Sequence, residues 1–150
     1  MAQFKNVLII GATGFFGSLV LEAFQKDSGF NLTLLQRASS KSRLPDHFKI
    51  ITIADSYPIE ELIAAFQGQD VIINCIATFS AKEQYRMVDA AIAAGVKRYV
   101  PSEYGLNNGN PNAQSLNSAF ADKGKFQAYL RAKADEGQIE WMSISCGIWC

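Results

Sequence analysis

The sequence predicts an α/β fold in which a doubly wound parallel sheet carries helices on both faces. The first observation is Val7–Ile10, an apolar segment that runs straight into a glycine-rich turn. The second is the segment that follows, Ser18–Lys26, in which apolar residues recur at helical spacing. The third is that apolar runs and helical patterns alternate along the rest of the chain. A wholly apolar strand suits the centre of a parallel sheet, and strand–helix alternation produces such a sheet.

The glycine-rich turn has the form of a dinucleotide-binding loop. It reads Gly11-Ala12-Thr13-Gly14-Phe15-Phe16-Gly17, with the spacing Gly-x-x-Gly-x-x-Gly. Gly11 permits a tight turn, Gly14 lets the backbone approach a ligand, and Gly17 lets the helix lie close to the strand. The N–H groups at the start of the helix, together with its dipole, bind a pyrophosphate. We therefore predict a Rossmann-type cofactor site at this turn; the alternative is an ordinary strand–turn–helix corner.

The remaining elements follow in order. The expected strands are Leu32–Gln36, Lys49–Ala54, Val71–Ile76, Lys97–Val100 and Ile139–Ser145. Three further helices are expected. The first begins at Pro58 and stops at Gly68, and one apolar face of it carries Ile59, Leu62, Ile63 and Phe66. The second is Ala81–Ala94, which Gly95 terminates, and the third is Ala119–Glu136. Ser39–Asp46 is interpreted as a loop or a short helix, and Gly105–Ser118 as a loop.

Composition limits the classes of partner. The 150 residues suffice for one domain, and we interpret residues 1–150 as one NAD(P)-binding domain. Lys+Arg and Asp+Glu both count 14, so the charge balance argues against nucleic acid and against an anionic membrane surface. The odd set Cys75, Cys146 and Cys150, with no signal peptide, predicts reduced thiols and a cytoplasmic protein. No apolar run approaches the roughly 20 residues that span a bilayer.

The carboxyl end of the second strand indicates which cofactor is bound. In open α/β sheets the ligand lies beyond the carboxyl ends of the strands, and an acidic residue after the second strand favours NAD. Here that place holds no acid; Arg37 stands there, followed by Ser39, Ser40 and Lys41. A guanidinium can pair with a 2′-phosphate, so this loop predicts NADP(H). The alternative is that Arg37 is a solvated loop cation.

Two further strand ends supply candidate cofactor residues. Asp55 follows the third strand, where its carboxylate could accept a hydrogen bond from the adenine amino group or could cap the turn. After the fourth strand, small residues around Ala77 and the ring of Phe79 lie where the cofactor should cross the sheet. Cys75 is interpreted as buried packing. No His/Cys cluster has metal-ligand spacing, so no metal site is predicted.

The segment Ala93–Gly105 resembles a signature of the NmrA-like family, especially of its isoflavone reductase-like branch among the atypical short-chain dehydrogenases. Its most specific part is Pro101-Ser102-Glu103-Tyr104-Gly105, and the glycine turn and Arg37 match the same family. The resemblance implies a Rossmann fold that binds NADP(H), followed by a smaller substrate domain. Family members run to about twice this length, and the last residues here form an apolar segment without a terminating helix. We therefore expect a fragment that lacks the substrate domain.

The resemblance also implies a catalytic lysine on the helix before the sixth strand. The family pattern Lys-x-x-apolar-Arg fits Lys123, although Gln127 stands where the arginine is expected, and Lys125 competes for the role. Tyr129 and Lys133 form the rival Tyr-x-x-x-Lys pattern of ordinary short-chain dehydrogenases. That rival is disfavoured because both residues fall in the closing turns of the helix. Lys123 itself could also be a solvated helix lysine.

Two functions are consistent with these features. The first is an NADPH-dependent reductase of the isoflavone reductase-like type that acts on a small aromatic or conjugated substrate, with Lys123 assisting the proton step. The second is a non-catalytic NADP(H)-binding redox sensor of NmrA type that acts through a protein partner. Ser102 and Glu103, after the fifth strand, are expected beside the nicotinamide, where they hold substrate or nicotinamide or simply pin the turn.

Overall fold

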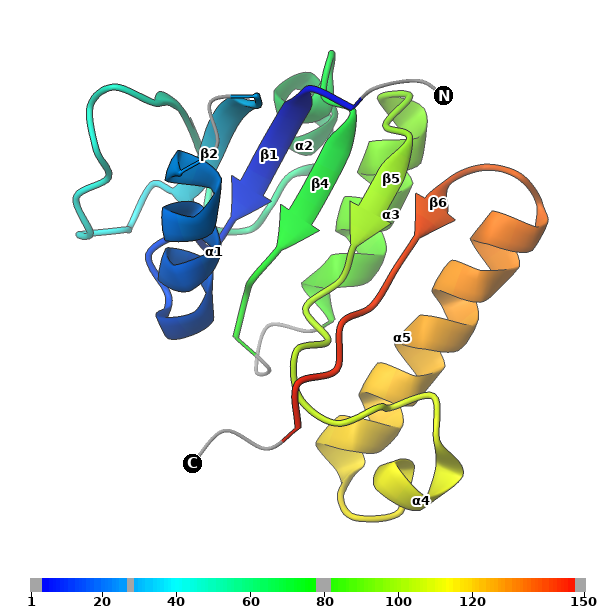
Figure 1. Ribbon diagram of the computed structural model, residues 1–150. Coiled ribbons are helices and arrows are strands. Elements are labelled where there is room, and N and C mark those ends of the chain that lie inside the picture. Colours follow the sequence, from blue (N-terminus) through cyan, green and yellow to red (C-terminus); the bar gives the residue numbers. More distant parts are fainter. Residues whose placement is uncertain (1–3, 27–28, 78–81, 148–150) are drawn as a thin grey trace.

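A six-stranded parallel sheet forms the centre of the structure (Figure 1). The computed structural model describes residues 4–26, 29–77 and 82–147. The strands are β1 (Asn6–Ile10), β2 (Asn31–Arg37), β3 (Lys49–Ile53), β4 (Val71–Asn74), β5 (Arg98–Val100) and β6 (Glu140–Trp141). Their order is β3-β2-β1-β4-β5-β6, and every neighbouring pair is parallel. This order is that of a Rossmann-type sheet, so the predicted fold class is confirmed.

Strand β1 lies at the point where the strand order reverses. Ile10 pairs with Leu35 of β2 on one side and with Asn74 of β4 on the other. The carboxyl ends of these three strands therefore meet at one edge of the sheet. In open sheets of this kind, the ligand crevice opens at this edge, beside the reversal of strand order.

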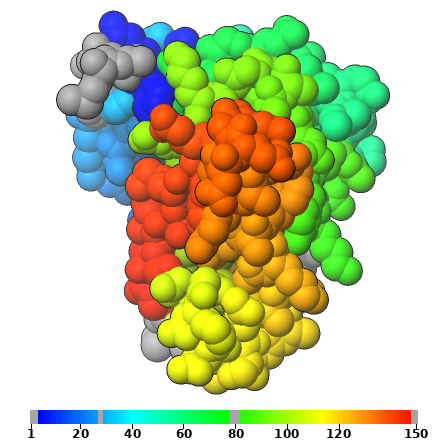
Figure 2. Space-filling view, turned by 90° about the vertical axis from the view of Figure 1, so that its right-hand side faces the viewer, coloured from blue at the N-terminus to red at the C-terminus, as the bar shows by residue number. Residues whose placement is uncertain are grey.

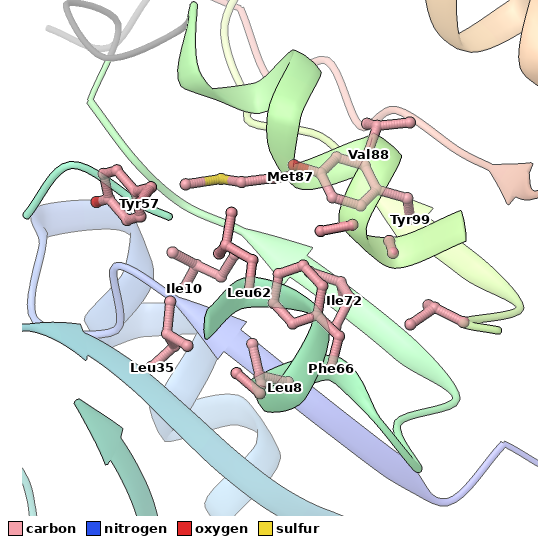
Figure 3. Close-up of a cluster of buried hydrophobic side chains, with 14 of the residues drawn as sticks. Leu8, Ile10, Leu35, Tyr57, Leu62, Phe66, Ile72, Met87, Val88 and Tyr99 are labelled. Carbon is pink, nitrogen blue, oxygen red and sulfur yellow. The ribbon is translucent and has the colours of Figure 1, made fainter. Parts of the chain in front are cut away.

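Helices cover both faces of the sheet. They are α1 (Phe15–Gln25), α2 (Ile59–Phe66), α3 (Glu83–Ala93), α4 (Pro111–Gln114) and α5 (Ser118–Asp135). Alternate side chains of β1 point to opposite faces, as strand geometry requires. Leu8 and Ile10 join the core cluster that also contains residues of α2, α3 and α5 (Figure 3). Val7 and Ile9 join the second cluster, to which α1 contributes Leu21.

Short polar residues and glycines set the helix ends. The side chain of Asn117 accepts a hydrogen bond from the Phe120 backbone N–H at 3.0 Å and caps α5. The stops predicted at Gly68 and Gly95 are present, since both glycines follow helices with φ of +74°. A left-handed residue of this kind ends a helix, and glycine adopts it without a steric penalty.

Some boundaries differ from the expectation. Helix α1 begins at Phe15 rather than Ser18, because Gly14 is the extended N-cap and the two phenylalanines form the first turn. Strand β6 stops at Trp141 rather than Ser145. Its neighbour β5 runs into Pro101, which has no N–H to continue the ladder. The predicted loop at 105–118 contains α4, whose start the side chain of Asn110 caps.

The flank beyond β5 consists of three segments that are close together. Figure 2 shows the short helix α4 beside one end of α5, with the chain that leaves β6 next to them. Along that segment Met142 and Ile144 are 43% and 45% exposed. Within the described ranges, no helix is both long and apolar enough to cross a membrane.

Candidate functional site

An open pocket of about 210 Å³ lies at the carboxyl ends of β1, β2 and β4. Its lining comes from the glycine turn, the end of β2 and the loop after it, and the end of β4: Ile10, Gly11, Ala12, Thr13, Gly14, Leu35, Gln36, Arg37, Ser40, Leu44, Tyr57, Cys75, Ile76 and Ala77. The structure thus brings together the first half of the glycine turn, Arg37 and Ala77. Phe15, Phe16, Gly17, Lys41 and Asp55 lie outside this lining.

The glycine turn packs too closely for side chains at two of its positions. Gly11 has φ +78°, and a Cβ there would lie 2.8 Å from the carbonyl oxygen of Cys75. A Cβ at Gly17 would lie 2.0 Å from the carbonyl oxygen of Gly11. Gly14, the N-cap of α1, has no side chain that could cap the helix, and the first turn of α1 contains no acidic residue. Helix α1 therefore contributes no capping side chain and no carboxylate of its own at its positive end, which suits a helix start that binds an anion.

The loop after β2 is fastened by Asp55. The backbone N–H of Ser39 donates to Oδ1 of Asp55 at 3.0 Å. Hydrogen bonds from Ser39, through its side chain and its backbone, hold the pKa of Asp55 below the ordinary value. The Ser40 N–H closes the turn by donating to the Arg37 carbonyl at 3.0 Å. Asp55 therefore anchors the segment that carries Arg37; its contact with adenine stays a prediction.

Tyr57 is a pocket residue that the sequence analysis missed. It is 7% exposed and has φ of +50°, which is uncommon for a residue other than glycine. Arg86, from α3, donates through Nη1 to the carbonyl oxygens of Ser56 at 2.6 Å and Tyr57 at 3.2 Å. These two hydrogen bonds connect residues about thirty positions apart in the chain, so no local sequence pattern could have revealed them.

The end of β4 has a packing role. Cys75 is buried, and burial raises the pKa of its thiol to about 11. It is therefore no thiolate at neutral pH, in agreement with its interpretation as packing. Ala77 is exposed at the pocket. Phe79 lies outside the described residues.

Residues 102–104 connect β5 to the other elements of the site. The Ser102 hydroxyl donates to the carbonyl oxygen of Ile76 at 2.7 Å, across to the end of β4. Its backbone N–H donates to Oε1 of Gln84 on α3 at 2.9 Å. The Tyr104 ring stacks on Phe16 of the glycine turn, with ring centroids 3.8 Å apart. This short run therefore fixes β4, α3 and α1 around one corner of the sheet.

Glu103 lies in the same run and is completely buried. Its Oε2 accepts hydrogen bonds from Nδ2 of Asn108 and from Nε2 of Gln127, both at 2.8 Å. Burial raises the pKa of Glu103 above its ordinary value, while these two hydrogen bonds and the charge of Lys123 act in the opposite direction.

Lys123 is a buried lysine one turn before Gln127 on α5. It is 7% exposed, and its Nζ donates to the carbonyl oxygen of Ser102 at 2.7 Å. Burial lowers its pKa, and the charge of Glu103 acts in the opposite direction. Lys125, by contrast, is exposed and donates to Asp122 at 3.2 Å. A buried amine with a lowered pKa at the edge of such a sheet is suited to proton transfer.

The rival pair Tyr129 and Lys133 faces another element. The Tyr129 hydroxyl hydrogen-bonds Oδ1 of Asp89 on α3, and Lys133 Nζ lies 5.5 Å from the centroid of the Tyr129 ring. Neither residue belongs to the pocket lining, and Lys123 and Lys125 lie outside that lining as well. No group of His, Cys, Asp and Glu that could hold a metal ion occurs within residues 4–26, 29–77 and 82–147.

Comparison with known proteins independently tests the family resemblance. A family model described as "NmrA-like family" matches residues 3–142. Oxidoreductase aprR of Aspergillus flavus is 39% identical over 143 residues, which are 95% of this chain and 48% of that protein. Phenylcoumaran benzylic ether reductase TP7 of Nicotiana tabacum is 33% identical over 157 residues, covering 97% of this chain and 49% of that protein. The chain thus spans about half the length of these relatives.

Solved structures share the fold. The structure of AtPrR2 with NADP+ and (+)pinoresinol has a TM-score of 0.77 at 21% identity and covers 97% of this chain and 50% of that chain. A binary complex of leucoanthocyanidin reductase with NADPH, from Vitis vinifera, has a TM-score of 0.70 at 24% identity over 94% of this chain and 49% of that chain. At such identities the likeness is one of fold.

Proposed function

The chain belongs to the NmrA-like family, and from this premise we propose that it is the NADP(H)-binding part of an isoflavone reductase-like oxidoreductase. The observation that carries the proposal is the pocket that joins the glycine turn to Arg37. A phosphate-binding helix start and a guanidinium in place of an acid are the two features that an NADP(H) site needs. Relatives named as oxidoreductases and reductases support the activity.

Different residues of the chain bind different parts of the cofactor. The backbone of Gly11–Gly14 and the start of α1 receive the pyrophosphate, and Arg37 pairs with the 2′-phosphate. Ala77 leaves room where the cofactor crosses the sheet. When bound, NADPH supplies the hydride. We extend the same proposal to Lys41 as a second cation for the 2′-phosphate, and to a cytoplasmic location.

Lys123 is the group that we assign to the proton step. Its ammonium is held at the carbonyl of Ser102, two residues after the end of β5, the strand next to β4. There it can donate a proton to an oxygen of a substrate that receives the hydride. The proposed substrate is a small aromatic or conjugated compound, because relatives that match this chain are named for benzylic ether reduction and isoflavone reduction.

One residue that differs from the family pattern favours a second function. Gln127 stands where the family resemblance implies an arginine. A cofactor site with an altered catalytic helix suits a non-catalytic, redox-sensing regulator with a protein partner. NADPH oxidation by the full-length protein across a panel of conjugated aromatic compounds separates the two functions: turnover supports the reductase, and tight binding without turnover supports the sensor.

The cofactor assignment is tested by titrating the chain with NADPH and NADH in a calorimeter. We expect NADPH to bind more tightly. Arg37→Ala should weaken NADPH binding about tenfold or more, because a charge-assisted bond to phosphate is lost, and should leave NADH nearly unchanged. Arg43→Ala is the matched control, since Arg43 is an exposed arginine of the same loop outside the pocket lining. Equal losses for both cofactors in Arg37→Ala would refute the 2′-phosphate role.

A further inference from the structure

Glu103 is a carboxylate with an unusual environment. It is completely buried, yet it faces two neutral amides, Asn108 and Gln127, which both donate to Oε2. Its second oxygen, Oε1, is also buried and has no hydrogen-bond partner among the described residues. A neutral side-chain amide could accept the same two hydrogen bonds with its oxygen. What a glutamate adds at this position is therefore its negative charge.

The cation that benefits from this charge is Lys123. Lys123 and Gln127 are one turn apart on α5, so they project from the same side of the helix. They dock on consecutive residues, Lys123 on the carbonyl of Ser102 and Gln127 on the carboxylate of Glu103. The carbonyl of Ser102 is a neutral acceptor, so this hydrogen bond supplies no negative charge to balance the buried ammonium. Opposite charges in such a buried setting are screened far less than on the surface.

We propose that Glu103 is a positioning residue that keeps Lys123 charged and docked on the Ser102 carbonyl, with Gln127 as a neutral hydrogen-bond partner that holds the carboxylate in place. The inference rests on the proposed role of Lys123. An arginine at position 127 would form its own ion pair with Glu103 and would put a second positive charge beside the lysine. With glutamine there, the carboxylate keeps a neutral hydrogen-bond partner.

The other charged groups around Lys123 have partners of their own. On α5, Asp122 pairs with Lys125 at 3.2 Å on the exposed side of the helix. Tyr85, on the adjacent α3, interacts with that same pair, and its pKa is raised chiefly by burial. Glu103 directly follows the residue whose carbonyl accepts the Lys123 hydrogen bond, and its charge acts to raise the pKa of Lys123. Burial alone opposes the ammonium, so the carboxylate is what sustains it.

The test is an NMR titration of the Lys123 side chain in ¹³C-lysine-labelled chain without cofactor, with the signal assigned by its absence in Lys123→Arg. In Glu103→Gln, which keeps the shape and an acceptor oxygen, we expect the neutral fraction of Lys123 at a fixed pH to rise about tenfold. The signal of the exposed Lys125 serves as the internal reference. Glu140→Gln, which removes an exposed carboxylate paired with Arg98, should leave Lys123 unchanged.

A second variant keeps the proposal testable if Glu103→Gln fails to fold. Gln127→Arg retains the carboxylate but supplies a competing cation, and it too should raise the neutral fraction of Lys123. Unchanged titration of Lys123 in either folded variant would overturn the proposal. Because the measurement uses no cofactor, its outcome is independent of NADPH binding, which the Arg37 titrations test separately.

Discussion

Replacing Gly17 by alanine should destabilise the fold through one contact. Gly17 lies in the first turns of α1, where a Cβ would stand 2.0 Å from the carbonyl oxygen of Gly11 and 2.9 Å from its carbonyl carbon. Both atoms belong to the backbone of the glycine turn, so no side chain can rotate away. To restore a separation of 3.0 Å, the helix and the turn must part by about 1 Å.

That displacement determines the size of the effect. Helix α1 supplies buried Leu21 and half-buried Val20 and Phe24 to the cluster on its face of the sheet. Moving the helix outward loosens all of these contacts together. Overpacking of this kind costs about 3 kcal/mol, at the upper end of the usual range, because rigid backbone lies on both sides of the contact. For a chain of this size, we expect the midpoint of thermal unfolding to fall by roughly 5–10 °C.

Gly14→Ala is the matched control for Gly17→Ala. Gly14 has φ −72° and ψ 167°, which alanine adopts readily, and a Cβ there would lie 3.3 Å from the Gly11 carbonyl oxygen. That contact is tight but is relieved by a shift of a few tenths of an ångström, so the stability of Gly14→Ala should fall by about 1 kcal/mol or less, well below the loss in Gly17→Ala. Its NADPH affinity should fall, because the new methyl group stands where the backbone approaches the pyrophosphate.

Urea unfolding followed by circular dichroism, with NADPH titration alongside, checks both variants. The reasoning requires Gly17→Ala to lose stability and Gly14→Ala to lose cofactor affinity while staying folded. If Gly17→Ala were as stable as the wild type, the close packing of α1 on the glycine turn would be refuted. If Gly14→Ala bound NADPH normally, the assignment of the turn to the pyrophosphate would be wrong.

Two further predictions concern aspartates. Asp55→Ala should weaken NADPH binding more than NADH binding in calorimetric titrations, because Asp55 fastens the loop that carries Arg37; equal losses would instead indicate contact with adenine, which both cofactors share. Asp70 accepts hydrogen bonds from the backbone of Asn6 and Lys5 and from Lys97, which lower its pKa to about 2. Its stabilising effect is present above its unfolded pKa and is lost as pH falls from about 5 through 2, so urea unfolding of Asp70→Asn should vary less with pH in that window.

The sequence predicted most of the fold because the signals that it carries are local. Apolar runs located the buried strands, and Gly68 and Gly95 located the helix ends, where a left-handed residue is needed. The predicted end of the last strand was wrong because a residue distant in the sequence sets it. Strand β6 ends early because Pro101, some forty residues away, cannot continue the ladder.

The candidate site shows the same difference between local features and features that depend on distant residues. Local patterns located the glycine turn and Arg37, and the structure places both in one pocket. No pattern near Tyr57 reveals that Arg86 holds it at the pocket. Asp55 was open to two interpretations, and the structure shows the hydrogen bond from Ser39 that anchors the loop. The contact of Asp55 with adenine and the catalytic role of Lys123 remain predictions.

By itself, the sequence determined the α/β class, the glycine turn and the absence of an acid after β2, because each depends on residue type and spacing within a short segment. Tertiary structure alone decided which lysine is buried. Lys123 and Lys125 are two residues apart on α5, and only the docking of the helix on residues 102–103 buries Lys123 and leaves Lys125 exposed. Burial and counter-charge depend on distances between elements, which residue order along one helix does not encode.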